Sequence, residues 1–131
     1  RQTSCFYGGV LVKEIYPAIE KADAVIWLCP NYNDAISANI SAVINRLTAL
    51  YRKTGFYDKA LFAVVVSGNS GSDSVAMQLL DALCINKGFY LPANFCISAT
   101  ANDPGEIFKI DGIREKAAEF AKTLKCNYKT I

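Results

Sequence analysis

The chain has 131 residues, of which 52% are hydrophobic and 20% are charged, and its formal net charge is +2. That length predicts one domain, residues 1–131, built around a single apolar core. Lys and Arg are scattered rather than gathered in a stripe with aromatic residues, so we expect no nucleic-acid partner. No apolar run has the length of a membrane span, so we expect no membrane partner either.

The number and spacing of the cysteines indicate the redox state of the cellular compartment and argue against some kinds of site. Five cysteines are present, an odd number, and no two form a Cys-x-x-Cys pair. This argues against a disulfide scaffold and a four-cysteine zinc site, and it is typical of a reducing cytoplasm. The sequence contains no histidine, the commonest general base and metal ligand. We therefore expect no metal site and no catalytic side chain.

The first part of the chain predicts a helix followed by a buried strand. Apolar residues recur at helical spacing over residues 10–21, where Pro17 predicts a kink or a helix that begins near it. Residues 24–29 form a continuous apolar run stopped by Pro30, which is typical of a strand buried on both faces. Within that strand we expect Trp27 to be a core residue and Cys29 to be structural rather than reactive.

The next elements repeat this alternation. Ser37 is expected to cap a helix that continues to Lys53, and Gly55 is expected to end it. Residues 60–66 form the clearest buried strand of the sequence. The polar loop 67–73 follows, with Asp73 as a candidate helix cap.

The last third predicts a helix, a strand and a final helix. The helix has apolar positions between Val75 and Cys84 and ends at Gly88, and the strand covers residues 89–98. The final helix covers residues 111–125, and its inward side chains are expected to be Ile113, Ala117, Phe120, Ala121 and Leu124. Strands that alternate with helices at this spacing predict a parallel α/β sheet with right-handed crossovers.

Two strand ends are unusually polar, and they are candidates for a binding site. Residues 30–34 follow the first strand, and residues 67–71 follow the second. In an open parallel sheet, ligands bind beyond the carboxyl ends of the strands. Small residues and asparagines let the backbone approach a flat polar ligand, and Tyr32 offers an aromatic face. The alternative is ordinary turn and cap chemistry, which uses the same residue types.

The sequence around the first strand resembles the NAD(P)H-dependent FMN reductase family. The family typically reads Ala-Asp, an apolar strand and Pro-x-Tyr, and here Ala22-Asp23, residues 24–29 and Pro30-Asn31-Tyr32 have that order. Residues 64–71 resemble its second flavin loop. The resemblance covers most of the chain, from about Val10 onward.

The resemblance implies a flavodoxin-like, doubly wound parallel sheet of five strands that binds FMN and is often assembled as a dimer. It implies that two groups of residues contact the isoalloxazine ring: Pro30, Asn31, Tyr32 and Asn33 from the first loop, and Ser67, Gly68, Asn69 and Gly71 from the second. The family's first strand and phosphate-binding loop have no counterpart before Val10. We therefore expect the sequence to be an N-terminally incomplete domain, or another chain to supply the strand.

These features lead to one functional hypothesis and two alternatives. The hypothesis is an FMN-dependent oxidoreductase that takes hydride from NAD(P)H and passes electrons to a quinone, a free flavin or a similar small acceptor. The cofactor carries that chemistry, which suits a chain without histidine. The first alternative is a flavodoxin-like electron-transfer module with no nicotinamide reaction. The second is a cofactor-free α/β binding domain.

Overall fold

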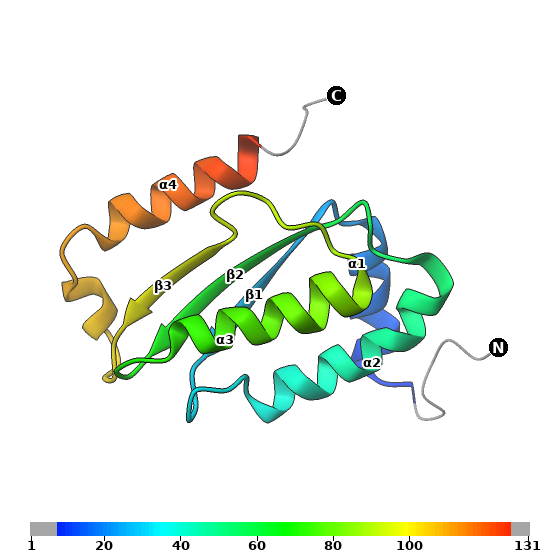
Figure 1. Cartoon of the computed structure of the whole chain (residues 1–131), viewed down its shortest axis with the longest axis horizontal. Coiled ribbons are helices and arrows are strands. Elements are labelled where there is room, and N and C mark those ends of the chain that lie inside the picture. The colour runs from blue at the N-terminus through cyan, green and yellow to red at the C-terminus, as the bar shows by residue number, and fades with distance from the viewer. Residues whose placement is uncertain (1–7, 127–131) are drawn as a thin grey trace.

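The computed structural model describes residues 8–126, which form a parallel β-sheet of three strands with helices packed around it (Figure 1). The strands are β1 (Ala24–Pro30), β2 (Ala60–Ser67) and β3 (Cys96–Thr100), and they lie side by side in that order. Both neighbouring pairs are parallel. The predicted α/β class and the parallel arrangement of the strands are therefore confirmed.

The helices connect and flank the strands. They are α1 (Tyr16–Lys21), α2 (Ala38–Thr54), α3 (Ser72–Leu79) and α4 (Ile113–Cys126). A π-helical turn, η1 (Leu11–Ile15), precedes α1, a second one, η2 (Leu80–Ile85), continues α3, and a short 3₁₀ helix, η3 (Glu106–Lys109), precedes α4. The backbone stays helical from η1 into α1, because Val10, Ile15 and Tyr16 all have right-handed helical dihedral angles. The helical segment predicted over residues 10–21 is therefore present, and Pro17 lies where the π-helical turn changes to α-helix rather than at the start of the helix.

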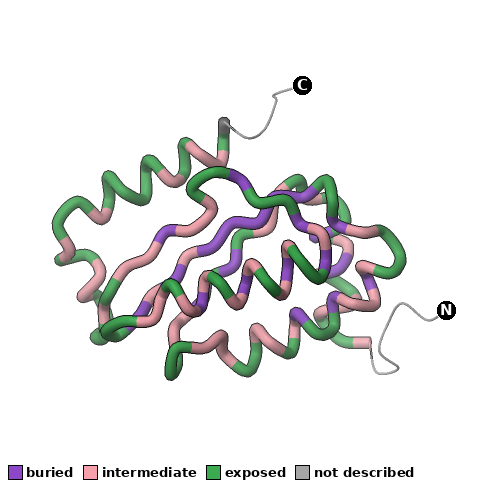
Figure 2. Tube along the Cα trace, in the orientation of Figure 1, coloured by how far each residue is buried: buried purple, intermediate pink, exposed green. Residues whose placement is uncertain are grey.

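The core lies on one face of the sheet, against α1, α2 and α3. Trp27 and Cys29 of β1 are 8% and 3% exposed, so both are core residues as predicted. They belong to the same cluster as the buried side chains of the three helices and of the central strand β2 (Figure 2). On the opposite face the ring of Phe62 meets the ring of Phe120 from α4 edge to face, with centroids 5.8 Å apart.

The ends of α2 confirm the predicted caps. The Ser37 side chain accepts a hydrogen bond from the backbone N–H of Ile40 at 3.4 Å, the capping interaction of a helix start. Gly55 follows the last helical residue with φ of +67°, a value that glycine adopts without strain.

The third strand is shorter and later than predicted. We expected residues 89–98, whereas β3 begins at Cys96, and Tyr90 forms only an isolated bridge with Ala60. Between them the chain leaves the ladder, because Pro92 has no N–H to donate and Asn94 adopts φ of +54°.

Two predictions about helices are wrong. Gly71, with φ of +85°, is the N-cap of α3, and Asp73 lies within the first turn and is not the cap. The inward stripe predicted for the last helix is not buried either: Ala117 and Ala121 are exposed and Phe120 is half-buried. The reason is that α4 packs mainly over β3, at one edge of the sheet, and only part of its apolar face meets a partner. No helix in residues 8–126 is long and apolar enough to cross a membrane.

Candidate functional site

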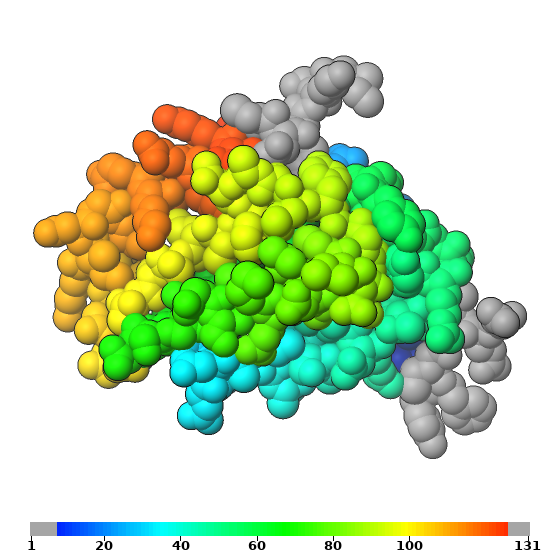
Figure 3. All heavy atoms as spheres, in the orientation of Figure 1, coloured from blue at the N-terminus to red at the C-terminus, as the bar shows by residue number. Residues whose placement is uncertain are grey.

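Three polar loops meet at one end of the sheet. They are the β1 loop (residues 31–37), the β2 loop (residues 68–71) and the β3 loop (residues 101–105). Because the three strands are parallel and adjacent, their carboxyl ends share one edge of the molecule. Figure 3 shows the loops at that end in cyan, green and yellow-orange.

A single amide group joins the β1 and β2 loops. Asn31 Nδ2 donates hydrogen bonds to the Ser70 carbonyl at 2.7 Å, to Ser67 Oγ at 3.1 Å and to Asp34 Oδ1 at 3.3 Å. Asn31 Oδ1 is buried and has no partner among the described protein atoms. The Asn31 Nδ2 group thus hydrogen-bonds to both loops, which are far apart in sequence.

The β1 loop folds back on itself and rests on α3. Tyr32 and Ala35 exchange backbone hydrogen bonds across Asn33 and Asp34, whose φ values are +54° and +57°. These are the dihedral angles of a two-residue hairpin turn, which Asn and Asp tolerate better than other residues. Two side chains of α3 hold the turn from below, since the Asp34 carbonyl accepts from Ser74 Oγ at 3.0 Å and from Gln78 Nε2 at 2.9 Å.

The β3 loop is bonded to the β2 loop in turn. Thr100 Oγ1 donates to the Asn69 carbonyl at 3.3 Å, and Asn102 Nδ2 donates to the Gly68 carbonyl at 3.2 Å. Glu106 Oε2 accepts from the backbone N–H groups of Asn102 and Asp103. Those two donors hold the pKa of the Glu106 carboxyl below its usual value of 4.5, so it is an anion at neutral pH.

The two glycines of the β2 loop are required by the neighbouring loops. A Cβ on Gly68 would clash with Asn102 Oδ1, and a Cβ on Gly71 would clash with Asp34 Oδ1. Gly71 also has a positive φ that disfavours other residues. A bulkier residue at either position therefore disturbs the loop junction itself, so substituting these glycines cannot isolate a ligand contact.

The predicted site residues are brought to one end of the sheet, but they differ in accessibility. Tyr32 is 63% exposed, and Asn33, Gly68 and Asn69 are also exposed. Pro30, Asn31 and Gly71 are half-buried, and Ser67 is 1% exposed beneath the loops. Ser67 therefore supports the junction from inside, while the exposed residues form its surface.

Sequence reasoning missed the residues that connect the loops. Ser74 and Gln78 are ordinary positions of an amphipathic helix, and nothing in their spacing indicates a contact with a loop some 40 residues earlier. The Asp-Pro-Gly sequence of residues 103–105 indicates only a turn. The hydrogen bonds of the β3 loop to the β2 loop depend on the register of β3, which was predicted too early in the chain.

The charge of the three loops bears on the group that they can hold. The segments 30–37, 67–74 and 100–106 contain Asp34, Asp73, Asp103 and Glu106 but neither Lys nor Arg. An acidic surface disfavours a phosphate, whereas a neutral heterocycle with N–H donors and carbonyl acceptors matches exposed backbone groups and amides. The residues present thus fit the isoalloxazine ring of FMN, and they do not fit its phosphate.

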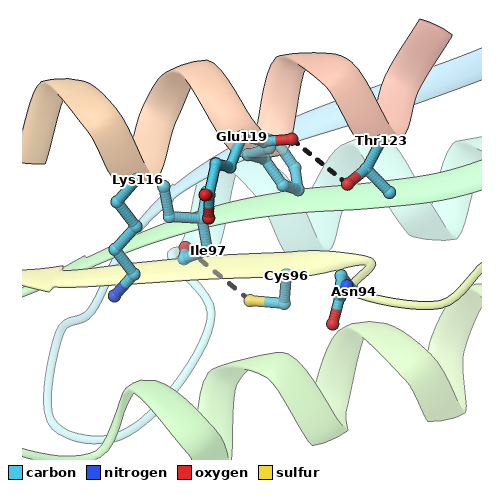
Figure 4. A pocket seen from close by; sticks show the side chains of 7 residues that line it. Asn94, Cys96, Ile97, Lys116, Glu119 and Thr123 are labelled. Carbon is cyan, nitrogen blue, oxygen red and sulfur yellow. Dashed lines mark hydrogen bonds between the residues drawn. The ribbon is translucent and has the colours of Figure 1, made fainter. Parts of the chain in front are cut away.

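A separate cavity lies between β3 and α4, away from the loop junction (Figure 4). Its volume is about 240 Å³, and Cys96, Lys116 and Glu119 are among the residues that line it. Burial raises the pKa of Cys96, and the nearby Lys116 opposes that shift to a smaller extent. None of the residues that line the cavity takes part in the hydrogen bonds of the three-loop junction, so the cavity is separate from the candidate site.

The arrangement has counterparts among solved structures. The Trp repressor binding protein of Bacillus subtilis aligns with a TM-score of 0.66 and 18% identity over 83% of this chain and 73% of that one. The rubredoxin oxygen:oxidoreductase of Desulfovibrio gigas aligns with a TM-score of 0.56 and 20% identity, over 93% of this chain and 27% of that one. RosB, solved with 8-demethyl-8-formylriboflavin-5'-phosphate, aligns with a TM-score of 0.60 and 16% identity, over 88% and 51%. No curated protein matches the chain by sequence.

These likenesses and the parallel sheet define the class: the protein has the flavodoxin-like α/β fold. The family follows from the sequence, because residues 2–103 match the NADPH-dependent FMN reductase family. The chain belongs to that family, as its Pro-x-Tyr loop predicted. Membership in this family supports the assignment of the protein as a flavin-dependent oxidoreductase.

Proposed function

We propose that this protein binds the isoalloxazine ring of FMN at the three-loop junction, accepts hydride from NAD(P)H and delivers electrons to a quinone, a free flavin or a similar small acceptor. The junction itself carries the proposal: polar loops at the carboxyl ends of adjacent parallel strands are bonded to one another, and they expose backbone and amide groups. Family membership and the flavin derivative held by RosB support the same ligand class.

The proposal assigns binding and positioning to the protein. Exposed groups of Asn33, Gly68 and Asn69 would hydrogen-bond the polar edge of the ring, and Tyr32 would cover part of one ring face. Asn31 would keep the two loops at a fixed separation. Bound FMN would supply hydride acceptance and electron transfer.

A visible spectrum of the purified, full-length gene product tests whether the protein is a flavoprotein. We expect flavin absorbance in the blue, either as purified or after incubation with FMN and removal of the excess. A protein that stays colourless and does not quench FMN fluorescence would favour the cofactor-free α/β binding domain instead.

Stopped-flow reduction separates the enzyme from an electron-transfer module. We expect NADPH or NADH to bleach the flavin absorbance rapidly, and a quinone or free flavin to restore it. If dithionite reduces the bound flavin while neither nicotinamide does, the protein is an electron carrier without a nicotinamide reaction.

The ring contact is tested with Tyr32→Ala, because Tyr32 is 63% exposed and its loss leaves the core intact. Aromatic contacts contribute roughly 0.5–1.5 kcal/mol, so FMN should bind about 2-fold to 13-fold more weakly. Tyr90→Ala is the matched control, since Tyr90 is also exposed but lies at the start of the segment that leads into β3, away from the carboxyl ends of the strands. Equal FMN affinity in both variants would remove Tyr32 from the site.

Two further properties belong to the proposal. The cysteine pattern supports a reducing cytoplasm, and the resemblance to the FMN reductases supports a homodimer. Light scattering of the eluting protein during gel filtration measures the assembly directly, and a monomeric mass at micromolar concentration would contradict the dimer.

A further inference from the structure

A pocket lies beside the β3 loop, between η3 and the start of α4, and we call it the Phe108 pocket. Its volume is about 400 Å³, and it is lined by Ile107, Phe108, Ile113, Arg114 and Ala117. The β3 loop runs directly into η3, where Phe108 N donates to the Gly105 carbonyl at 3.2 Å. In Figure 1 this orange segment lies beside the tip of the β3 arrow. The Phe108 pocket is therefore a neighbour of the three-loop junction.

The pocket combines an exposed aromatic ring with a guanidinium group. Phe108 is 68% exposed, and Arg114 Cζ lies over its ring, 5.7 Å from the ring centroid. Within residues 8–126 the Arg114 guanidinium makes no ion pair, so its N–H groups are available to a ligand. An aromatic face binds a flat heterocycle, and a guanidinium binds a phosphate through two parallel hydrogen bonds. The two groups together suit a nucleotide.

Charge favours this pocket over the loops as the place for a phosphate. The three loops contain four carboxylates and neither Lys nor Arg. The first cations after the β3 loop in the sequence are Lys109, Arg114 and Lys116. Lys116 Nζ already donates to the Ser98 carbonyl at 2.8 Å, and neither Lys109 nor a carboxylate is among the described residues that line the Phe108 pocket. Arg114 is therefore the cation best placed to hold a phosphate beside the junction.

We propose that the Phe108 pocket binds the adenosine half of NADPH, with the adenine against the Phe108 ring and the 2′-phosphate on Arg114. This inference rests on the proposed function, because that function needs a nicotinamide dinucleotide, and the family to which the chain belongs is described as NADPH-dependent. The nicotinamide end of the molecule then lies toward the flavin ring at the junction. NADH has no 2′-phosphate, so Arg114 gives the protein a preference for NADPH.

Binding of 2′,5′-ADP tests the pocket without any reaction, because this nucleotide carries the adenosine 2′-phosphate but no nicotinamide. Calorimetry measures its affinity for the purified full-length protein, for Arg114→Gln and for Arg52→Gln. Arg52 is the matched control, since it is an exposed arginine in the last turn of α2. We expect Arg114→Gln to bind about tenfold or more weakly and Arg52→Gln to bind like the parent. Equal affinity of the two variants, or no binding by the parent at millimolar 2′,5′-ADP, would overturn the proposal.

Steady-state kinetics with the two reduced nicotinamides provides a second readout. Arg114→Gln should raise the KM for NADPH about tenfold and leave kcat and the KM for NADH unchanged, because Arg114 contacts a phosphate that NADH lacks. Phe108→Ala should raise the KM for both dinucleotides about twofold or more, since both contain adenine. Equal increases of the two KM values in Arg114→Gln would contradict the contact with the 2′-phosphate.

The affinity for FMN separates this inference from the proposed function. Arg114→Gln should bind FMN as tightly as the parent does. Weaker FMN binding by this variant, with riboflavin binding unchanged, would overturn the inference, because Arg114 would then hold the phosphate of the flavin. If the parent binds FMN and NADPH does not reduce it, the proposed hydride transfer is wrong, and the 2′,5′-ADP comparison still decides whether the pocket binds the nucleotide.

Discussion

At the scale of single residues, the candidate site depends on one asparagine. Asn31 immediately follows β1, and its amide contacts both its own loop and the β2 loop. Its donor group faces three acceptor atoms, while its carbonyl oxygen is buried without a partner. The contact between the two loops therefore requires an amide at residue 31, because a carboxylate has no N–H group to donate to these acceptors.

We predict that Asn31→Asp destabilises the junction. An aspartate replaces the donor with an acceptor opposite the Ser70 carbonyl and the Asp34 carboxylate, and the lost hydrogen bonds cost about 1–3 kcal/mol. Asn33→Asp is the control, because it adds the same charge at an exposed position that tolerates a positive φ. Urea denaturation of both variants measures the difference, and equal midpoints would contradict the role given to Asn31.

Cys29 provides a prediction about pH. Burial, and secondarily the nearby Cys96, raises the pKa of its thiol from 9.0 to about 11. The unfolded thiol ionises near pH 9 and the folded one near pH 11, so its contribution to stability is complete below pH 9. That contribution, about 3 kcal/mol, is lost as the pH rises from 9 to 11.

The test is to compare urea midpoints of the parent and Cys29→Ala at pH 8 and pH 11. The variant is expected to lose less stability than the parent between the two pH values, because it has no thiol to ionise. Identical losses would mean that Cys29 ionises in the folded protein as easily as in the unfolded chain.

At the scale of elements, α2 has the best-defined ends. Ser37 caps its start through Ile40 N, and Gly55 ends it, so both boundaries follow from local chemistry. These boundaries also define where the β1 loop ends, because the loop runs directly into the cap.

We predict that Ser37→Ala costs about 0.5–2 kcal/mol of stability, the usual contribution of a side-chain N-cap. Ser41→Ala lies one turn further along α2 and is the matched control, since alanine favours a helix interior. Thermal unfolding of both variants gives the comparison. A Ser37→Ala protein as stable as Ser41→Ala would show that the cap contributes little.

At the scale of the whole molecule, the two edge strands of the sheet differ in how they are protected from pairing with another strand. Lys116 and α4 protect β3, whereas β1 presents uncharged, unpaired backbone within residues 8–126. Because α4 packs mainly over β3, at one edge of the sheet, Ala117 and Ala121 stay exposed.

We predict that Lys116→Ala increases aggregation of the full-length protein, because it frees the Ser98 carbonyl on the outer side of β3. Lys122→Ala removes an exposed charge from the same helix and serves as the control. Turbidity during mild heating, below the melting temperature of both variants, reports the difference. Equal aggregation rates would show that Lys116 does not protect the edge.

The sequence alone predicted the elements whose signals are local. The continuous apolar runs of β1 and β2, the cap at Ser37 and the stop at Gly55 depend on neighbouring residues, so they could be identified without tertiary information. Pro-x-Tyr after a buried strand was also sufficient to indicate the family.

The tertiary structure decided what depends on contacts between distant segments. The late start of β3 follows from how residues 91–94 leave the ladder, and local apolar character cannot reveal that departure. Ser74, Gln78 and Asn102 join the loops through hydrogen bonds across 34 to 44 residues, and such bonds leave no periodic pattern in the sequence. Local propensity thus determined the strands and helices, whereas parallel pairing alone brought their polar ends together into one site.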